Sequence, residues 1–147
     1  MYDQERGSQG SILVVDQEEW CRAFLASVIK LLGIEDFKLV STVAEALVAL
    51  EATTFDLVIT DHRQPDYRHL LESARLRHPA TRFIVMLHQR TLSQQFLYLE
   101  QVDIAYKPLS LDEIARKIRH AMHQKNLRQA EEELRRLKQE AFRIFLG

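Results

Sequence analysis

Residues 55–65 read FDLVITDHRQP, and this stretch decides the fold. Residues 55–60 form a short apolar and β-branched run, which is typical of a strand buried on both faces of a parallel sheet. Asp61 follows directly, so a carboxylate is expected at the carboxyl end of that strand. Pro65 then breaks the chain before a predicted helix over residues 67–77. The stretch therefore predicts one β–α unit with a candidate functional residue at the end of its strand.

The chain on both sides repeats this unit. Short apolar runs predict the other strands, and the segments that follow them carry apolar residues at helical spacing. The predicted strands are residues 12–15, 37–40, 83–87 and 102–106, and the predicted helices are residues 18–32, about 42–50, 92–99 and the segment from 111 onward. This alternation predicts an α/β protein with a five-stranded, doubly wound parallel sheet, because right-handed crossovers place helices on both faces.

The composition limits the class of protein. The chain has 147 residues, which suits one domain of about 100–150 residues plus an extension. No apolar run reaches the roughly 20 residues of a membrane span, and residues 1–10 are polar, so we expect a flexible N-terminus and a cytoplasmic protein that does not enter the membrane. The formal net charge of −1 gives no reason to expect direct nucleic-acid binding. We interpret Cys21, the only cysteine, as a structural residue.

Three polar residues directly follow predicted strands, namely Asp16, Asp61 and Lys107. Sites in open α/β sheets form where the carboxyl ends of the strands meet, so we expect these side chains to lie together. A carboxylate beside a divalent cation can attack a phosphoryl group, and a lysine can neutralise the transferred oxygens. Any one of the three alone would be interpreted as a solvated loop residue. Together they favour phosphoryl chemistry.

The stretches that carry these residues are ILVVDQEEW, FDLVITDHRQP, RFIVMLHQR and AYKPLS. In this order they resemble the receiver domains of response regulators in bacterial two-component signalling, over about residues 11–123. The resemblance implies a flavodoxin-like receiver fold. It also implies that a histidine kinase or a phosphotransfer protein donates the phosphoryl group.

The resemblance assigns roles to particular residues. Asp61 falls at the phosphoacceptor position. Mg²⁺ would be held by Asp16, Asp61 and the backbone carbonyl of Arg63. Lys107 and His88 fall at positions that contact the phosphoryl group, and Ile104 falls at the switch position of the last strand.

Several of these positions depart from the family pattern. Gln17 stands where a second acidic residue is usual, so we expect weakened Mg²⁺ binding. His88 replaces a Ser or Thr, and Ile104 replaces an aromatic residue. We place Tyr106 on the opposite face of the strand from Ile104. Without a hydroxyl at residue 88 and an aromatic ring at residue 104, the family's usual coupling of phosphoryl contact to ring rotation cannot operate. Any conformational switch in this chain must use other residues.

Alternatives remain open for the histidines and arginines near Asp61. His88 either hydrogen-bonds to local backbone groups or contacts the phosphoryl group. Arg63 and Arg90 either are solvated or hold an oxyanion together. A metal site formed by His62, His88 and Asp16 is the least favoured alternative.

The last predicted helix continues beyond the domain. Its apolar residues recur at alternating spacings of three and four, which is the pattern of a coiled coil. They are Leu127, Ala130, Leu134, Leu137, Ala141 and Ile144. Glu133 and Lys138 fall at g and e positions, which favours a parallel homodimer, with a single exposed helix as the alternative. We interpret residues 124–147 as a coiled-coil extension that leads to an output domain in a longer protein.

Two functions follow from these patterns. The first is a receiver domain that accepts a phosphoryl group on Asp61 and relays the change through the C-terminal helix. The alternative is a pseudo-receiver that dimerises or binds partners without phosphorylation, which Gln17, His88 and Ile104 favour. An enzyme such as an aspartyl phosphatase is not expected, because no second acid lies two residues after Asp61.

Overall fold

The computed structural model describes residues 10–89 and 101–146. The described elements are β1 (Ser11–Val15), α2 (Glu19–Leu31), β2 (Asp36–Val40), α3 (Val43–Ala52), β3 (Leu57–Asp61), α4 (Tyr67–Arg77), β4 (Arg82–Leu87), β5 (Val102–Tyr106) and α5 (Leu111–Leu146). The strands form one five-stranded sheet in the order β2-β1-β3-β4-β5, and every neighbouring pair is parallel. The predicted α/β class and doubly wound topology are confirmed.

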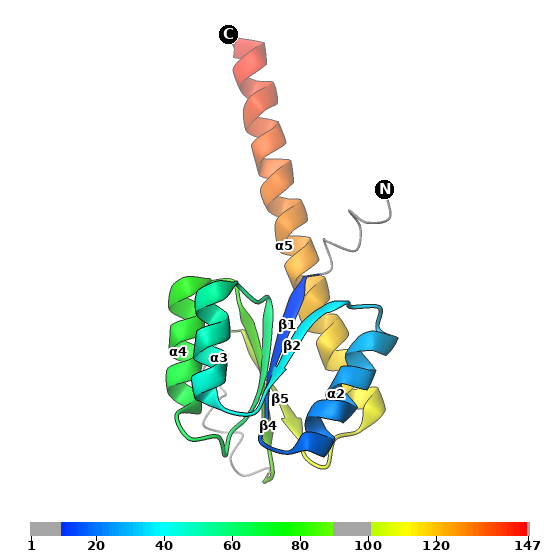
Figure 1. The fold of residues 1–147 in the computed structure, drawn as a ribbon. Coiled ribbons are helices and arrows are strands. Elements are labelled where there is room, and N and C mark those ends of the chain that lie inside the picture. Colours follow the sequence, from blue (N-terminus) through cyan, green and yellow to red (C-terminus); the bar gives the residue numbers. More distant parts are fainter. Residues whose placement is uncertain (1–9, 90–100, 147) are drawn as a thin grey trace.

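The helices cover both faces of the sheet (Figure 1). Helices α2 and α5 pack on one face, where Val14 and Ile59 belong to the same buried cluster as Ile114 of α5. Helices α3 and α4 cover the other face, where Val15 and Val58 are buried. Side chains alternate between the two faces along each strand, so strands buried on both sides must be apolar throughout. This explains why the strands appear as continuous apolar runs in the sequence.

Local signals set most of the element boundaries. Thr42 caps α3 by accepting a hydrogen bond from the backbone N–H of Glu45 at 3.2 Å. Gly33 follows α2 with φ of +81°, a left-handed conformation that glycine adopts without strain. The third strand begins at Leu57, two residues later than predicted, and ends on Asp61. The predicted helix over residues 92–99 lies outside the described residues.

The prediction for Tyr106 is wrong. Tyr106 and Ile104 both pack against the buried cluster between the sheet and helices α3 and α4. Residues two apart on a strand share a face, because the side-chain period of a strand is two. An aromatic ring therefore does lie on the face of β5 that carries the switch position, one pleat nearer to Lys107.

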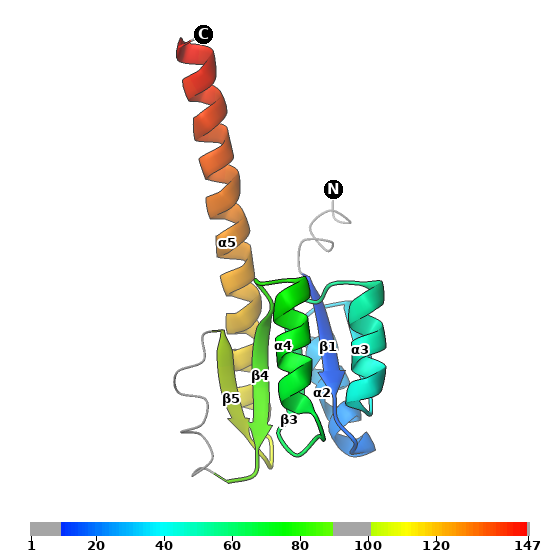
Figure 2. The ribbon, with the colours of Figure 1, turned by 90° about the vertical axis from the view of Figure 1, so that its left-hand side faces the viewer.

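Helix α5 extends well beyond the sheet (Figures 1 and 2). Its first turns bury Ile114, Ile118 and Met122 against the domain. Farther along, the apolar side chains are exposed, and Leu134 and Leu137 each keep 53% of their accessible surface. None of the helices in the described part of the chain combines the length and the apolar character that a membrane crossing requires.

Candidate functional site

β3 ends on Asp61, and the strand arrows in Figure 2 point away from the protruding part of α5. Lys107, directly after β5, donates hydrogen bonds from its Nζ atom to Oδ2 of Asp61 and to Oδ2 of Asp16, both at 2.7 Å. All three residues are buried. The topology brings them together because β1, β3 and β5 end at the same edge. The structure thus places together the three residues that the strand-end argument selected.

Glu18 is a further acidic residue of this site, and the sequence analysis missed it. Its Oε1 atom lies 3.4 Å from Nζ of Lys107, and its carboxylate accepts a hydrogen bond from the indole N–H of Trp20. The chain turns toward the site because Oδ1 of Asp16 accepts the backbone N–H of Glu18 at 2.8 Å. The loop after β1 therefore supplies two carboxylates to the site, those of Asp16 and Glu18, on either side of Gln17.

Arg63 contributes its side chain as well as its backbone. Its backbone N–H donates to Oδ1 of Asp61 at 2.8 Å. Its Nη2 atom lies 2.7 Å from Oε1 of Glu18 and 3.2 Å from Oδ2 of Asp61. The guanidinium therefore links the two carboxylates. Arg90, its predicted partner in oxyanion binding, lies outside the described residues.

The side chain of His88 contacts Asp61 rather than local backbone groups. Its Nε2 atom lies 3.2 Å from Oδ2 of Asp61, and its side chain is 30% exposed. His62 is turned differently, with its Nδ1 atom 3.1 Å from the backbone oxygen of Met86. This geometry favours the interpretation in which His88 belongs to the pocket. Ile104, which the resemblance assigns to the switch position, lies on β5 three residues before Lys107. It is partly buried against the cluster under α3 and α4.

The charges of the site stabilise one another. Burial alone would raise the pKa of Asp61, but its hydrogen bonds from Lys107 and Arg63 outweigh that effect and hold this pKa far below its usual range. Burial would likewise lower the pKa of Lys107, whereas its hydrogen bonds to Asp16 and Asp61 raise it well above its usual value. Asp61 is consequently a carboxylate and Lys107 an ammonium ion at neutral pH.

The donor set of the site fits a divalent cation. An open cavity of about 330 Å³ is lined by Asp16, Gln17, Glu18, Asp61, Arg63 and Gln64. Carboxylate oxygens of Glu18 and Asp61 and a ring nitrogen of His88 all lie within 4.8 Å of one another. Carboxylate oxygens are the hard ligands that Mg²⁺ prefers. This group replaces the set of His62, His88 and Asp16 that the sequence analysis considered and disfavoured.

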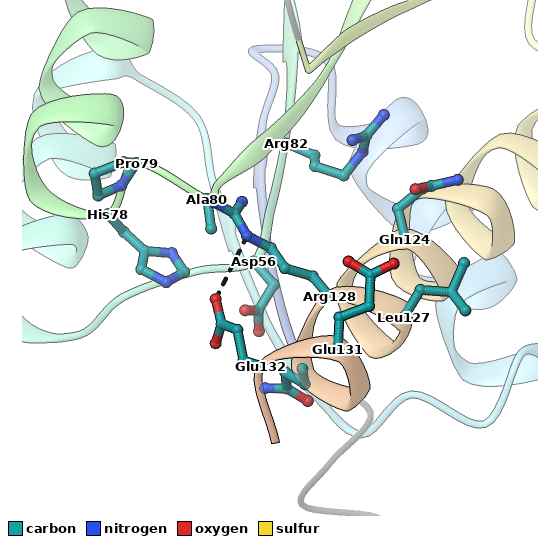
Figure 3. Close-up of a pocket in the computed structure, with 11 residues that line it drawn as sticks. Asp56, His78, Pro79, Ala80, Arg82, Gln124, Leu127, Arg128, Glu131 and Glu132 are labelled. Atoms are coloured by element: carbon teal, nitrogen blue, oxygen red, sulfur yellow. Dashed lines mark ion pairs between the residues drawn. The ribbon is translucent and has the colours of Figure 1, made fainter. Parts of the chain in front are cut away.

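A second cavity of about 630 Å³ lies at the opposite edge of the sheet, between the start of β4 and the extended part of α5 (Figure 3). Its lining mixes the acidic residues Asp56, Glu131 and Glu132 with the basic residues Arg82 and Arg128. Leu127 of the predicted coiled-coil pattern also lines it, whereas none of the candidate site residues around Asp61 does. Its mixed charge indicates no particular ligand, and the acidic cavity at Asp61 remains the candidate functional site.

Comparisons with known proteins place this fold. No protein-family model matches the chain, and no curated protein matches it in sequence. Among solved structures, a response regulator receiver protein from Sinorhizobium medicae is 21% identical, with a TM-score of 0.69 over 78% of this chain and 95% of that one. The receiver domain of nitrogen regulatory protein C is 26% identical, with a TM-score of 0.67 over 80% of this chain and 97% of that one.

A further neighbour is described as an adenylate cyclase from Rhodopirellula baltica, with 22% identity and a TM-score of 0.70 over 86% of this chain and 96% of that chain. The structure thus has the flavodoxin-like receiver fold. It shares this fold with the receiver domains named above.

Proposed function

We propose that this chain is a phosphoaccepting receiver domain in which Asp61 takes a phosphoryl group from a histidine kinase or phosphotransfer protein in the cytoplasm. The observation that carries the proposal is the 2.7 Å contact between Nζ of Lys107 and Oδ2 of Asp61. It keeps a nucleophilic carboxylate ionised beside a cation that can also meet a transferred phosphoryl oxygen. The receiver domain comprises residues 11–123 in this proposal.

The roles of the neighbouring groups follow from their positions. An oxygen of Asp61 attacks the phosphorus, the bond from phosphorus to the donor nitrogen breaks, and the donor keeps that electron pair. Lys107 neutralises charge that develops on the phosphoryl oxygens, and His88 lies on the same side of the carboxylate, where it can donate a hydrogen bond. Asp16, Asp61 and the backbone carbonyl of Arg63 would hold Mg²⁺. When bound, this ion supplies further positive charge to the phosphoryl oxygens.

The C-terminal helix is the proposed output element. Residues 124–147 form a parallel coiled coil with a second copy of the chain in this proposal, and they lead to an output domain. The exposed stripe that includes Leu127, Leu134 and Leu137 supports pairing, because a lone helix would leave it in water. Glu133 and Lys138 would attract each other across the parallel pair.

The second candidate is a pseudo-receiver that dimerises or binds partners without being phosphorylated. The observation that favours it is the number of groups already bonded to Asp61. Its carboxylate contacts Lys107, Arg63 and His88. A phosphoryl donor must displace some of these contacts.

Intact mass spectrometry separates the two functions. The protein is incubated with phosphoramidate and saturating Mg²⁺, beside the Asp61→Ala variant. A receiver gains the mass of one phosphoryl group, and the variant does not. Absence of the adduct in the wild type would favour the pseudo-receiver. No turnover of phosphate esters is expected in either case.

A further inference from the structure

Arg63 takes a position between two carboxylates that a bridging metal ion could take. One nitrogen, Nη2, contacts both Oε1 of Glu18 at 2.7 Å and Oδ2 of Asp61 at 3.2 Å. A second nitrogen of the same guanidinium, Nε, lies 3.4 Å from Oδ1 of Asp61. The guanidinium thus meets both oxygens of the phosphoacceptor and ties them to the loop that follows β1. Charge-assisted contacts of this kind are stronger than neutral hydrogen bonds.

The charge balance of the site depends on this arginine. The described carboxylates at the site are those of Asp16, Glu18 and Asp61, and the cations in contact with them are Lys107 and Arg63. Three negative and two positive charges leave a net charge of −1. With the Arg63 side chain withdrawn, the same count gives −2, which matches the charge of a divalent cation.

A metal ion and the guanidinium therefore compete for the same oxygens. We propose that Arg63 is a resident counter-ion that neutralises the acidic site in the absence of metal and must leave before Mg²⁺ binds. This inference deepens the proposed function, on which it rests, because it names the residue that sets the metal requirement of Asp61. The weak Mg²⁺ binding expected of this chain then has two causes, the competing guanidinium of Arg63 and the missing carboxylate at Gln17.

The side chain of Arg63 is free to move out of the site. It is 52% exposed, whereas the side chain of Lys107 is 3% exposed and is held by two buried carboxylates. Removal of the Arg63 side chain therefore vacates solvent-accessible space and leaves no apolar cavity, so the Arg63→Ala variant should fold.

Trp20 provides a probe of the site that needs no phosphodonor. It is the only tryptophan in the sequence, its indole N–H donates to Glu18, and Nζ of Lys107 lies 5.7 Å from the centre of its ring. When Mg²⁺ binds at Asp61 and displaces the Arg63 guanidinium, Glu18 loses its contact with Arg63, and the surroundings of the indole change. A fluorescence titration with Mg²⁺ therefore reports binding independently of phosphorylation, so failure of the proposed function and failure of this inference are distinguishable.

The experiment compares the wild type, Arg63→Ala and Arg77→Ala by this titration. Arg77 is the control because it is an exposed arginine at the other end of α4, 3.9 Å from Glu51, so its removal changes the net charge equally. We expect Arg63→Ala to bind Mg²⁺ about tenfold more tightly than the wild type, the effect of one lost charged hydrogen bond. Arg77→Ala should match the wild type.

A second measurement detects Mg²⁺ binding even if the fluorescence of Trp20 does not change. The Mg²⁺-dependent rise in the urea midpoint of unfolding should be larger for Arg63→Ala than for the wild type, because a ligand that binds only the folded state stabilises it. Equal or weaker Mg²⁺ binding by Arg63→Ala in both measurements would overturn the inference. Absence of Mg²⁺ binding by all three proteins would overturn it as well.

Discussion

The Nζ atom of Lys107 lies 2.7 Å from Oδ2 of Asp61, although 46 residues separate them in the sequence. The two residues meet because β3 and β5 are parallel strands of one sheet and their carboxyl ends lie at the same edge. A hydrogen bond from the same ammonium group to Asp16 joins a third strand end to this contact. Stability and the proposed chemistry therefore depend on one cluster of charges.

Loss of Lys107 should destabilise the fold. The Lys107→Met variant keeps much of the apolar stem but leaves the buried carboxylates of Asp16 and Asp61 without their shared cation. We expect the free energy of unfolding to fall by about 3–5 kcal/mol, as when one partner of a buried ion pair is removed. Urea denaturation measures the change. Adding Asp16→Asn to the same variant should recover part of the loss, and an unchanged stability of Lys107→Met would contradict the proposed charge balance.

Acid should weaken the folded state through Asp61. Its pKa is lowered in the folded protein, so its contribution to stability is present above the ordinary aspartate pKa of about 3.9 and is lost as the pH falls below that value toward the lowered one. The stability difference between the wild type and Asp61→Asn should therefore move against the wild type as the pH falls from about 6 to about 3. Urea midpoints across this range test it. A pH-independent difference would show that Asp61 is not held ionised by its neighbours.

Cys21 should be unreactive in the native protein. Its side chain is buried, and burial raises the pKa of its thiol to about 12, so the reactive thiolate is scarce at neutral pH. Dithionitrobenzoate should modify it only as the protein unfolds, with a rate that rises in urea. Fast modification of the folded protein at neutral pH would disprove the structural interpretation of this residue.

The coiled-coil proposal predicts a dimer that depends on the exposed stripe of α5. Leu134→Asp places a charge in the predicted seam and should shift the chain from dimer to monomer in analytical ultracentrifugation, while Arg135→Asp outside the seam should not. Single charge reversals, Glu133→Lys and Lys138→Glu, should each weaken a parallel dimer, and the double reversal should restore it. A wild-type monomer at all concentrations would favour the lone exposed helix.

The sequence predicted the fold well for a physical reason. Strands buried on both faces must be apolar throughout, and helices that pack on a sheet must repeat their apolar residues at helical spacing. Both patterns are visible without coordinates, and α4 over Tyr67–Arg77 and β5 over Val102–Tyr106 begin and end where the sequence predicts. The ends of the predicted strands also identified Asp16, Asp61 and Lys107 as residues that lie together.

The rest of the site depends on loop geometry, which the pattern of residue types does not contain. Glu18 reaches the site because Asp16 accepts its backbone N–H, and Arg63 because its guanidinium folds back toward Asp61. The signal for Glu18 in the sequence is an acidic residue two positions after Asp16, in the loop that follows the first predicted strand. The face predicted for Tyr106 is wrong because Ile104 and Tyr106 are two residues apart and therefore share a face of β5.

The most direct test of Asp61 as phosphoacceptor is chemical trapping. The protein is treated with phosphoramidate and Mg²⁺ and then with borohydride, which reduces an aspartyl phosphate to homoserine, and the modified residue is located by peptide sequencing in a mass spectrometer. The proposed function predicts the reduced residue at position 61 and its absence without phosphodonor. Modification of Asp16 or phosphorylation of His88 or His62 in place of Asp61, or no modification at saturating Mg²⁺, would contradict it.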